Sequence, residues 1–210
     1  EKYDQLAQSV FLEMFGDPVR NEKGWTLETI PEFISSDKYA LKRGPFGGSL
    51  KKEIFVEDGY LVYEQFHALN DDFNFERYYI SEKKYQELKA FKVAPGDIII
   101  SCSGINLGAI AIIPNNAKSG VINQALLKIT LDQKKMNNVF FKHLFSNNRV
   151  REKLFGYRRG SGVPNFPPMS TIKQYRFINP PIYLQNKFEK YIQNIEIQEV
   201  KVNQSLQKSE

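Results

Sequence analysis

Residues 179–210 carry the most regular pattern of apolar and polar positions in the chain. After Pro180 and Pro181 the sequence contains no further proline or glycine. Apolar residues then recur at spacings of four, three, seven and four, and only Glu199 stands where another was due. These are the a and d spacings of a helix that packs along a second helix. The pattern predicts a long C-terminal helix with an interface stripe of Phe188, Ile192, Ile195, Val202 and Leu206.

The first fifteen residues repeat this theme on a shorter scale. Tyr3, Ala7, Val10 and Met14 are spaced four, three and four, which predicts an amphipathic helix that ends at 16–18, where Gly, Asp and Pro follow one another. Two interpretations of the terminal helices stay open. They are either docking arms that need a partner, or ordinary core helices that pack on the central part of the chain.

The central part is dominated by short apolar runs separated by turn residues. Alternation and turn signals predict strands and helices between the two terminal helices. A short strand or a first turn is expected at 24–30. Strands are expected at 55–63 (strand, turn, strand), 78–80, 98–100, 109–113 and 121–129, and helices at 85–91 and 140–154. The predicted fold class is α+β: a mixed, β-rich globule flanked by an N-terminal helix and a long coiled-coil-type C-terminal helix. The chain is expected to divide into an N-terminal helix (1–17), a central globular domain (18–179) and a C-terminal helix (180–210).

Composition narrows the possible classes of protein. The chain of 210 residues has a net charge of +5, which favours an anionic partner only weakly. The single cysteine, Cys102, excludes an internal disulfide, and with His67 and His143 it falls short of a structural zinc set, so no metal site is expected. No apolar run approaches the roughly 18 residues of a membrane span. We expect a cytoplasmic protein, and the missing N-terminal Met suggests a segment of a longer chain.

One glycine-rich segment combines flexibility with positive charge. Residues 42–52 contain four basic residues, three glycines, one proline and no acidic residue. Glycines let a backbone approach a phosphate closely, and lysine and hydroxyl groups can hold that phosphate. A solvated glycine-rich hairpin is the alternative. If the segment binds nucleic acid, the phosphate contacts are Lys42, Arg43, Ser49, Lys51 and Lys52.

Further candidates follow the predicted strands. Arginine, glutamine, histidine and asparagine side chains can recognise the edges of bases. The segment 149–176 has seven basic residues against one acidic residue, a surplus larger than that of the whole chain. A lone histidine or an arginine pair is, however, often an ordinary structural or solvated feature. The candidate base contacts are Gln65, His67, Arg158, Arg159 and Asn165, with Ser103 and Asn106 as weaker ones.

Three catalytic interpretations find little support. Asn179-Pro180-Pro181 resembles the catalytic motif of amino-group DNA methyltransferases, but Ile182 follows where an aromatic residue must stack on the flipped base. Glu82 and Lys84 have the Glu-x-Lys spacing of some nucleases without an acidic partner on an upstream strand. Cys102 lacks a positioned base nearby in sequence and is expected to be a buried small residue. No catalytic residue and no cofactor are assigned.

The order of several motifs resembles one family. The motifs are Gly-x-Phe-Gly-Gly-Ser-Leu (44–50), Pro-Gly-Asp-Ile-Ile-Ile-Ser (95–101), Gly-x-Asn-x-Gly (104–108), Asn123-Gln124, Gly-Ser-Gly-Val-Pro-Asn (160–165) and Pro-Pro-Ile-x-x-Gln-x-x-Phe (180–188). Residues 12–18 look like the end of that family's conserved helix. Taken together, the set resembles the specificity subunit of type I restriction-modification enzymes over essentially the whole chain.

The resemblance implies a non-catalytic DNA reader. Such subunits typically carry two target recognition domains joined by conserved helices, and each domain recognises half of a split double-stranded DNA site. The helices also dock methyltransferase subunits, which bring S-adenosylmethionine, and through them the restriction subunit indirectly. This chain matches one such half, so its further partner is a second recognition half or a copy of itself. A stand-alone DNA-modifying enzyme and a basic protein-interaction adaptor are the alternatives.

Overall fold

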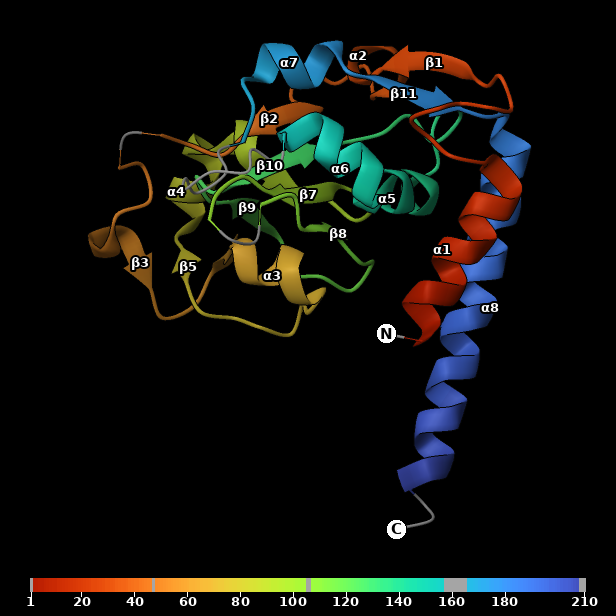
Figure 1. The fold of residues 1–210 in the computed structure, drawn as a ribbon. Helices are drawn as coiled ribbons and strands as arrows, with labels where there is room; N and C mark the ends of the chain where they lie inside the picture. The colour runs from red at the N-terminus through yellow and green to blue at the C-terminus, as the bar shows by residue number, and fades with distance from the viewer. Residues whose placement is uncertain (1, 47, 105–106, 157–165, 208–210) are drawn as a thin grey trace.

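The computed structural model describes residues 2–46, 48–104, 107–156 and 166–207. Over these ranges the chain forms a mixed α+β globule, with helix α1 near its start and the long helix α8 near its end (Figure 1). The predicted fold class is confirmed. The helices are α1 (Lys2–Phe15), α2 (Ile30–Phe33), α3 (Gln65–Asn70), α4 (Glu82–Glu87), α5 (Asn138–Ser146), α6 (Asn148–Phe155), α7 (Met169–Gln174) and α8 (Ile182–Gln207), with 3₁₀ turns η1 (Lys52–Ile54) and η2 (Lys89–Phe91).

The described strands form three sheets. A two-stranded sheet has the order β1-β11, a four-stranded sheet the order β2-β10-β7-β8, and a five-stranded sheet the order β3-β5-β4-β9-β6. All pairings are antiparallel except that between β4 and β9. The strands are β1 (Thr26–Thr29), β2 (Leu41–Arg43), β3 (Phe55–Val56), β4 (Tyr60–Tyr63), β5 (Tyr79–Ile80), β6 (Lys92–Val93), β7 (Ile98–Ser101), β8 (Ile110–Ile112), β9 (Gly120–Ile122), β10 (Leu126–Ile129) and β11 (Arg176–Asn179).

The predicted strand, turn and strand at 55–63 are present, but β3 and β4 do not pair with each other. Strand β5 lies between them, and Ile80 is the partner of both Phe55 and Tyr60. Gly59, with φ of +149°, passes so close to the end of β5 that an added Cβ would lie 2.5 Å from the carbonyl oxygen of Ile80. The turn therefore wraps around a third strand that joins from later in the sequence.

The single strand predicted at 121–129 is wrong. The chain forms β9 in the five-stranded sheet, turns, and continues as β10 in the four-stranded sheet. The side chain of Asn123 accepts a hydrogen bond from the backbone N–H of Ala125 (3.0 Å), and the Asn123 carbonyl accepts one from Leu126 (3.2 Å). Asparagine side chains compete with strand ladders for backbone groups in this way. The polar residues inside the apolar run thus form the connection between two sheets.

The helix predicted at 140–154 is also interrupted by an asparagine. Asn147 ends α5 and begins α6, and its side chain accepts the backbone N–H of Arg149 (3.0 Å). Asn137 caps the start of α5 through bonds from Val139 (2.9 Å) and Phe140 (3.0 Å). Asparagine is among the best N-cap residues because its oxygen satisfies N–H groups that lack partners in the helix.

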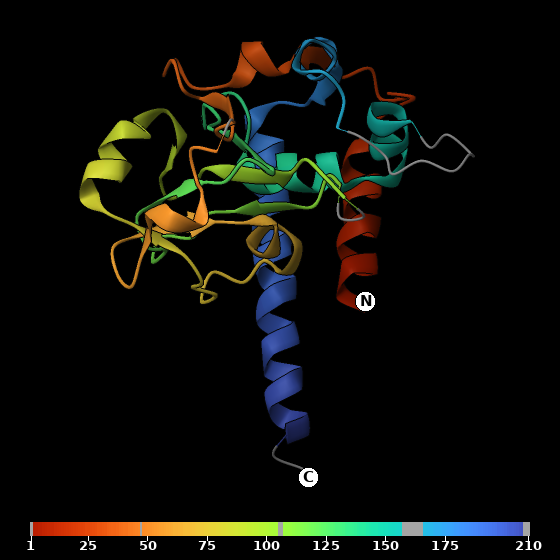
Figure 2. The ribbon, with the colours of Figure 1, turned by 90° about the vertical axis from the view of Figure 1, so that its left-hand side faces the viewer.

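The largest core cluster joins both terminal helices to the globule. Phe11 and Phe15 of α1, Phe140 of α5 and Phe188 of α8 are each at most 2% exposed. Their ring centroids lie 4.8–6.5 Å apart, in mostly edge-to-face arrangements that aromatic rings favour. Helix α1 runs antiparallel along the first part of α8, which then continues past the globule (Figures 1 and 2). The core interpretation is therefore confirmed for α1 and for the first turns of α8.

This packing corrects part of the predicted interface stripe. Phe188 and Ile192 (0% and 4% exposed) belong to the chain's own core, and Ile195 packs against that core while partly exposed. Phe188 and Ile192 are therefore covered within the chain, by α1 and α5, whereas Ile195 keeps part of its surface exposed. Val202, by contrast, is 43% exposed. The side chain of Leu206 lies outside the part of the chain that the structure describes.

A buried glutamine fixes the start of α8. The side-chain oxygen of Gln185 accepts the backbone N–H of Asn137 (2.9 Å), and its amide donates to the carbonyl of Pro180 (2.7 Å) and to Oδ1 of Asn179 (2.8 Å). The residue is 0% exposed. Because buried polar groups are costly without partners, these bonds fix α8 against the start of α5.

Candidate nucleic-acid interface

Several connections meet at one edge of the four-stranded sheet. Arg43, the last residue of β2, pairs with Leu127 of β10, and Ser101, the last residue of β7, pairs with Leu126. Because these neighbours are antiparallel, β2 and β7 end at the edge where β10 begins. The "loop edge" is defined as the segments that meet there, 44–46, 64–65, 102–104 and 123–125, together with 48–52, which continues the first of them towards β3. It includes most of the described residues that the sequence assigned to DNA.

Close backbone packing holds the first of these segments. The N–H of Gly44 donates to the carbonyl of Leu126 (2.8 Å), and a Cβ at position 44 would lie 1.8 Å from the carbonyl oxygen of Asn123. Only glycine fits there. This glycine is therefore explained by contact with Asn123 within the fold, whereas the sequence had suggested close approach to a phosphate.

Lys42 and Arg43 point to opposite faces of β2, as neighbouring strand residues do. The Lys42 ammonium lies 5.4 Å from the ring centre of Phe91. The Arg43 guanidinium lies 5.8 Å from the ring of Phe46 and 5.4 Å from that of Phe166, and its Nε is buried with no hydrogen-bond partner among the described residues. Arg43 thus places its charge under the loop edge, between two aromatic rings, and Lys42 is directed elsewhere.

Gln65 connects two segments of the loop edge. Its amide nitrogen lies 2.8 Å from Oγ of Ser101, 2.7 Å from the carbonyl oxygen of Ser103 and 3.1 Å from Oγ of Ser103. A carbonyl oxygen can only accept, so the contact with Ser103 fixes which end of the amide is nitrogen. Gln65 is partly exposed, and Ser103 is exposed. Because the amide nitrogen is hydrogen-bonded within the protein, the side-chain group that Gln65 can present to a ligand is its oxygen.

His67 is wrong as a base contact. It is 0% exposed, its Nδ1 accepts the backbone N–H of Glu64 (2.9 Å), and its Nε2 lies 2.9 Å from the carbonyl oxygen of Phe75, to which it must donate. Burial lowers the pKa of the imidazole, so the neutral ring is favoured. Nδ1 thus holds the start of α3 and Nε2 holds the loop that follows it, so both nitrogens are engaged within the protein.

The remaining candidates differ in their exposure and in whether their side chains are hydrogen-bonded within the protein. Lys51 and Lys52 are exposed, whereas the hydroxyl of Ser49 donates to the carbonyl of Phe46 (3.0 Å) and closes a turn. Cys102 is buried, as expected, and burial raises the pKa of its thiol to about 12. Four further candidates lie outside the described residues: Asn106, Arg158, Arg159 and Asn165.

Sequence reasoning overlooked two aromatic residues at this edge. Phe46 and Phe166 flank the Arg43 guanidinium, and Phe46 is 69% exposed. Phe46 stands in the middle of a segment with four basic residues and three glycines, which was the available signal. Phe166 carried no such signal, because its contact with Arg43 spans most of the domain in sequence.

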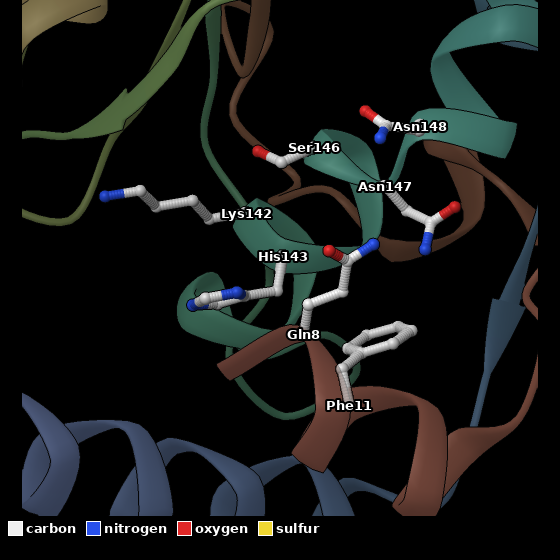
Figure 3. Close-up of a pocket in the computed structure, with 7 residues that line it drawn as sticks. All are labelled: Gln8, Phe11, Lys142, His143, Ser146, Asn147 and Asn148. Carbon is white, nitrogen blue, oxygen red and sulfur yellow. The ribbon is translucent and has the colours of Figure 1, made fainter. Parts of the chain in front are cut away.

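A separate cavity of about 250 Å³ lies between α1 and the α5–α6 junction. Figure 3 shows its lining, and several of its polar groups are already engaged in the fold. Asn147 caps α6, Lys142 pairs with Asp71, and the ring of His143 contacts Phe188 at 5.2 Å. The lining residues are Gln8, Phe11, Lys142, His143, Ser146, Asn147 and Asn148.

The described residues contain no group of three or more His, Cys, Asp or Glu side chains placed to hold a metal ion. None of the helices in these ranges combines the length and the hydrophobicity needed to cross a bilayer.

Comparison with solved structures identifies the fold. An S subunit of a type I restriction-modification system from M. genitalium superposes over 99% of this chain, with a TM-score of 0.58 and 13% identity. The HsdS subunit from Thermoanaerobacter tengcongensis matches over 97%, with a TM-score of 0.60 and 14% identity. The fold is that of a type I specificity subunit. A chain from a structure on complex assembly and conformational transition of the type I R-M system matches over 99%, with a TM-score of 0.68 and 14% identity.

The matches to this specificity-subunit fold cover only part of each neighbour. The chain spans 46–51% of those chains, about half their length. No family model and no curated protein matches the sequence. The likeness is therefore one of fold, at low sequence identity, and it includes the terminal helices as well as the sheets.

Proposed function

We propose that this chain recognises one half of a split double-stranded DNA site as part of a type I specificity subunit. The observation that carries the proposal is the match of 97–99% of the chain to about half of each S-subunit structure. In this proposal the chain recognises DNA and does not itself catalyse a reaction. Residues 18–179 act as the target recognition domain, and 1–17 and 180–210 act as the spacer helices.

The loop edge is the proposed DNA face. Lys51 and Lys52 are exposed cations on the connection that follows β2, suited to phosphates. Gln65 and Ser103 are joined to each other and present polar groups at the same edge. In this proposal the Gln65 side-chain oxygen accepts a hydrogen bond from an amino group such as N6 of adenine or N4 of cytosine. Arg43 contributes charge from beneath the surface, and Ser49 shapes the turn.

The exposed distal part of α8 is the proposed docking surface. Its apolar stripe continues from Phe188 and Ile192 to Val202, which is 43% exposed. In the proposal this segment pairs with the helices of a second recognition half or of a second copy. The same helices dock the methyltransferase subunits and, through them, the restriction subunit.

Selection from a pool of randomised duplexes at low salt tests the function. We expect the bound fraction to be enriched in a short motif of a few base pairs. Two inverted copies at fixed spacing are expected if the chain pairs with itself. Absence of binding at low salt would overturn the proposal, and so would binding without enrichment when methyltransferase subunits are present.

A double variant tests the phosphate contacts separately. Replacing Lys51→Ala and Lys52→Ala should weaken binding to all duplexes alike and reduce the slope of log K against log salt by about two. The matched control is Lys83→Ala with Lys89→Ala, which removes the same charge from exposed positions on α4 and η2. An equal loss in both double variants would show that net charge alone, and not the loop edge, carries the effect.

A further inference from the structure

Phe46 has the largest exposed fraction, 69%, of the large hydrophobic side chains described in the structure. Most other phenylalanines lie in the core, including Phe11, Phe15, Phe33 and Phe140 at 2% or less. Single exposed hydrophobic residues are common and need no explanation by themselves. The surroundings of Phe46 distinguish it from that background.

The protein holds Phe46 from both sides. The Gly44 N–H is bonded to Leu126, and Pro45 then restricts the backbone just before Phe46. On the other side, the Ser49 hydroxyl donates to the carbonyl of Phe46 (3.0 Å). The Arg43 guanidinium lies 5.8 Å from the ring centre. The ring is therefore presented at the loop edge by fixed groups on either side.

The chemistry around the ring indicates what could cover it. A phenyl ring offers a flat apolar face, and the Arg43 guanidinium lies 5.8 Å from its centre. The exposed residues Lys51 and Lys52 follow in the same connection, five and six positions later. A purely apolar partner surface would leave these cations without counter-charge. A nucleic acid offers both components, since flat bases stack on aromatic rings and phosphates neutralise cations.

We propose that Phe46 stacks on the bases at one step of the bound half-site and partly unstacks that step. This inference rests on the proposed function and deepens it, because it adds a residue that senses how easily the DNA deforms. Apolar side chains inserted between base pairs unstack them and kink the duplex. Pyrimidine–purine steps open most easily, so Phe46 would favour such a step without hydrogen bonding to either base.

The test uses the full 210-residue chain and duplexes of the selected half-site that carry 2-aminopurine at one position at a time. The fluorescence of this base analogue rises when it is unstacked. We expect a rise at one position with the unchanged protein, and loss of that rise with Phe46→Ala. Because stacking on an aromatic side chain contributes about 1–3 kcal/mol per base, Phe46→Ala should weaken binding about 5- to 150-fold. Phe46→Trp, which keeps a flat ring, should retain both signals.

The matched control is Tyr183→Ala, which removes a similarly exposed ring (67%) from α8. It should change neither affinity nor fluorescence. Circular dichroism verifies the fold of each variant, and the measurement with the unchanged protein does not depend on any variant folding.

Failure of the inference is distinguishable from failure of the proposed function. If the unchanged protein enriches no sequence, both the proposed function and the proposed role of Phe46 are overturned. If the protein binds its motif but no position brightens, or Phe46→Ala binds as well as the unchanged chain, only the inference is overturned. If Phe46→Ala binds DNA normally but no longer recruits methyltransferase subunits, the ring serves a protein partner, and the inference is again wrong.

Discussion

The two parts of α8 share one helix but differ in what covers their apolar side chains. In the first part, Phe188 and Ile192 are 0% and 4% exposed and pack among the rings of α1 and α5. In the second part, Ile197, Val200 and Val202 are 43–54% exposed. Of these, Val202 keeps the spacing of Phe188 and Ile192, so the same periodicity serves internal packing in one part of the helix and leaves an apolar side chain exposed in the other. Periodicity predicts that a helix packs, and the fold decides what it packs against.

The substitution Phe188→Ala is the strongest test of whether the first part of α8 belongs to the core of the chain. Removing a fully buried ring leaves a cavity among Phe11, Phe15 and Phe140, and such changes cost about 3–5 kcal/mol. Urea denaturation should show this loss in the free energy of unfolding. Tyr191→Ala, at a 42% exposed position one turn further along, should change it by at most about 0.5 kcal/mol. Unchanged stability with lost self-association would mean that the first part, too, is an intermolecular surface.

A smaller effect is expected from Gln185→Leu. The substitution leaves the Asn137 N–H and the Pro180 carbonyl buried without their partner, which costs about 1–3 kcal/mol. The same substitution at the exposed Gln193 removes no side-chain hydrogen bond to any residue that the structure describes and should be near neutral. Thermal denaturation of both variants measures the difference. If the two variants melt together, the bonds of Gln185 do not fix the start of α8.

Much of the fold was visible in the sequence because it depends on local patterns. The long C-terminal helix, the N-terminal helix and the buried strand at Ile98–Ser101 each follow from spacing or apolar runs. What the pattern could not give is which element covers which. Phe188 looks like part of a free stripe until α1 is placed beside it, and β5 enters between β3 and β4 from later in the chain.

The candidate site shows the same limit in polar residues. The charge of the segment 42–52 predicted an exposed basic connection, and Lys51 and Lys52 are exposed. His67 has the same polarity, yet its neutral ring is buried because backbone groups of Glu64 and Phe75 satisfy both nitrogens. The orientation of Gln65 depends on Ser101 and Ser103, which lie 36 and 38 residues away. Such contacts exist only once the sheet has assembled.

The smallest effect on stability, and the sharpest separation of the two parts, is expected at the distal end of α8. At about 100° per residue, Val202 continues the stripe of Phe188 and Ile192, whereas Ile197 and Val200 lie together on the opposite side. Val202→Lys should change the free energy of unfolding by no more than about 0.5 kcal/mol, because the side chain is already exposed. It should nevertheless abolish helix pairing with a second copy or recognition half, measured by sedimentation. Ile197→Lys with Val200→Lys is the matched control, expected to spare pairing. If only this control abolishes pairing, the stripe ends where the core ends, and the opposite side of the distal helix carries the contact.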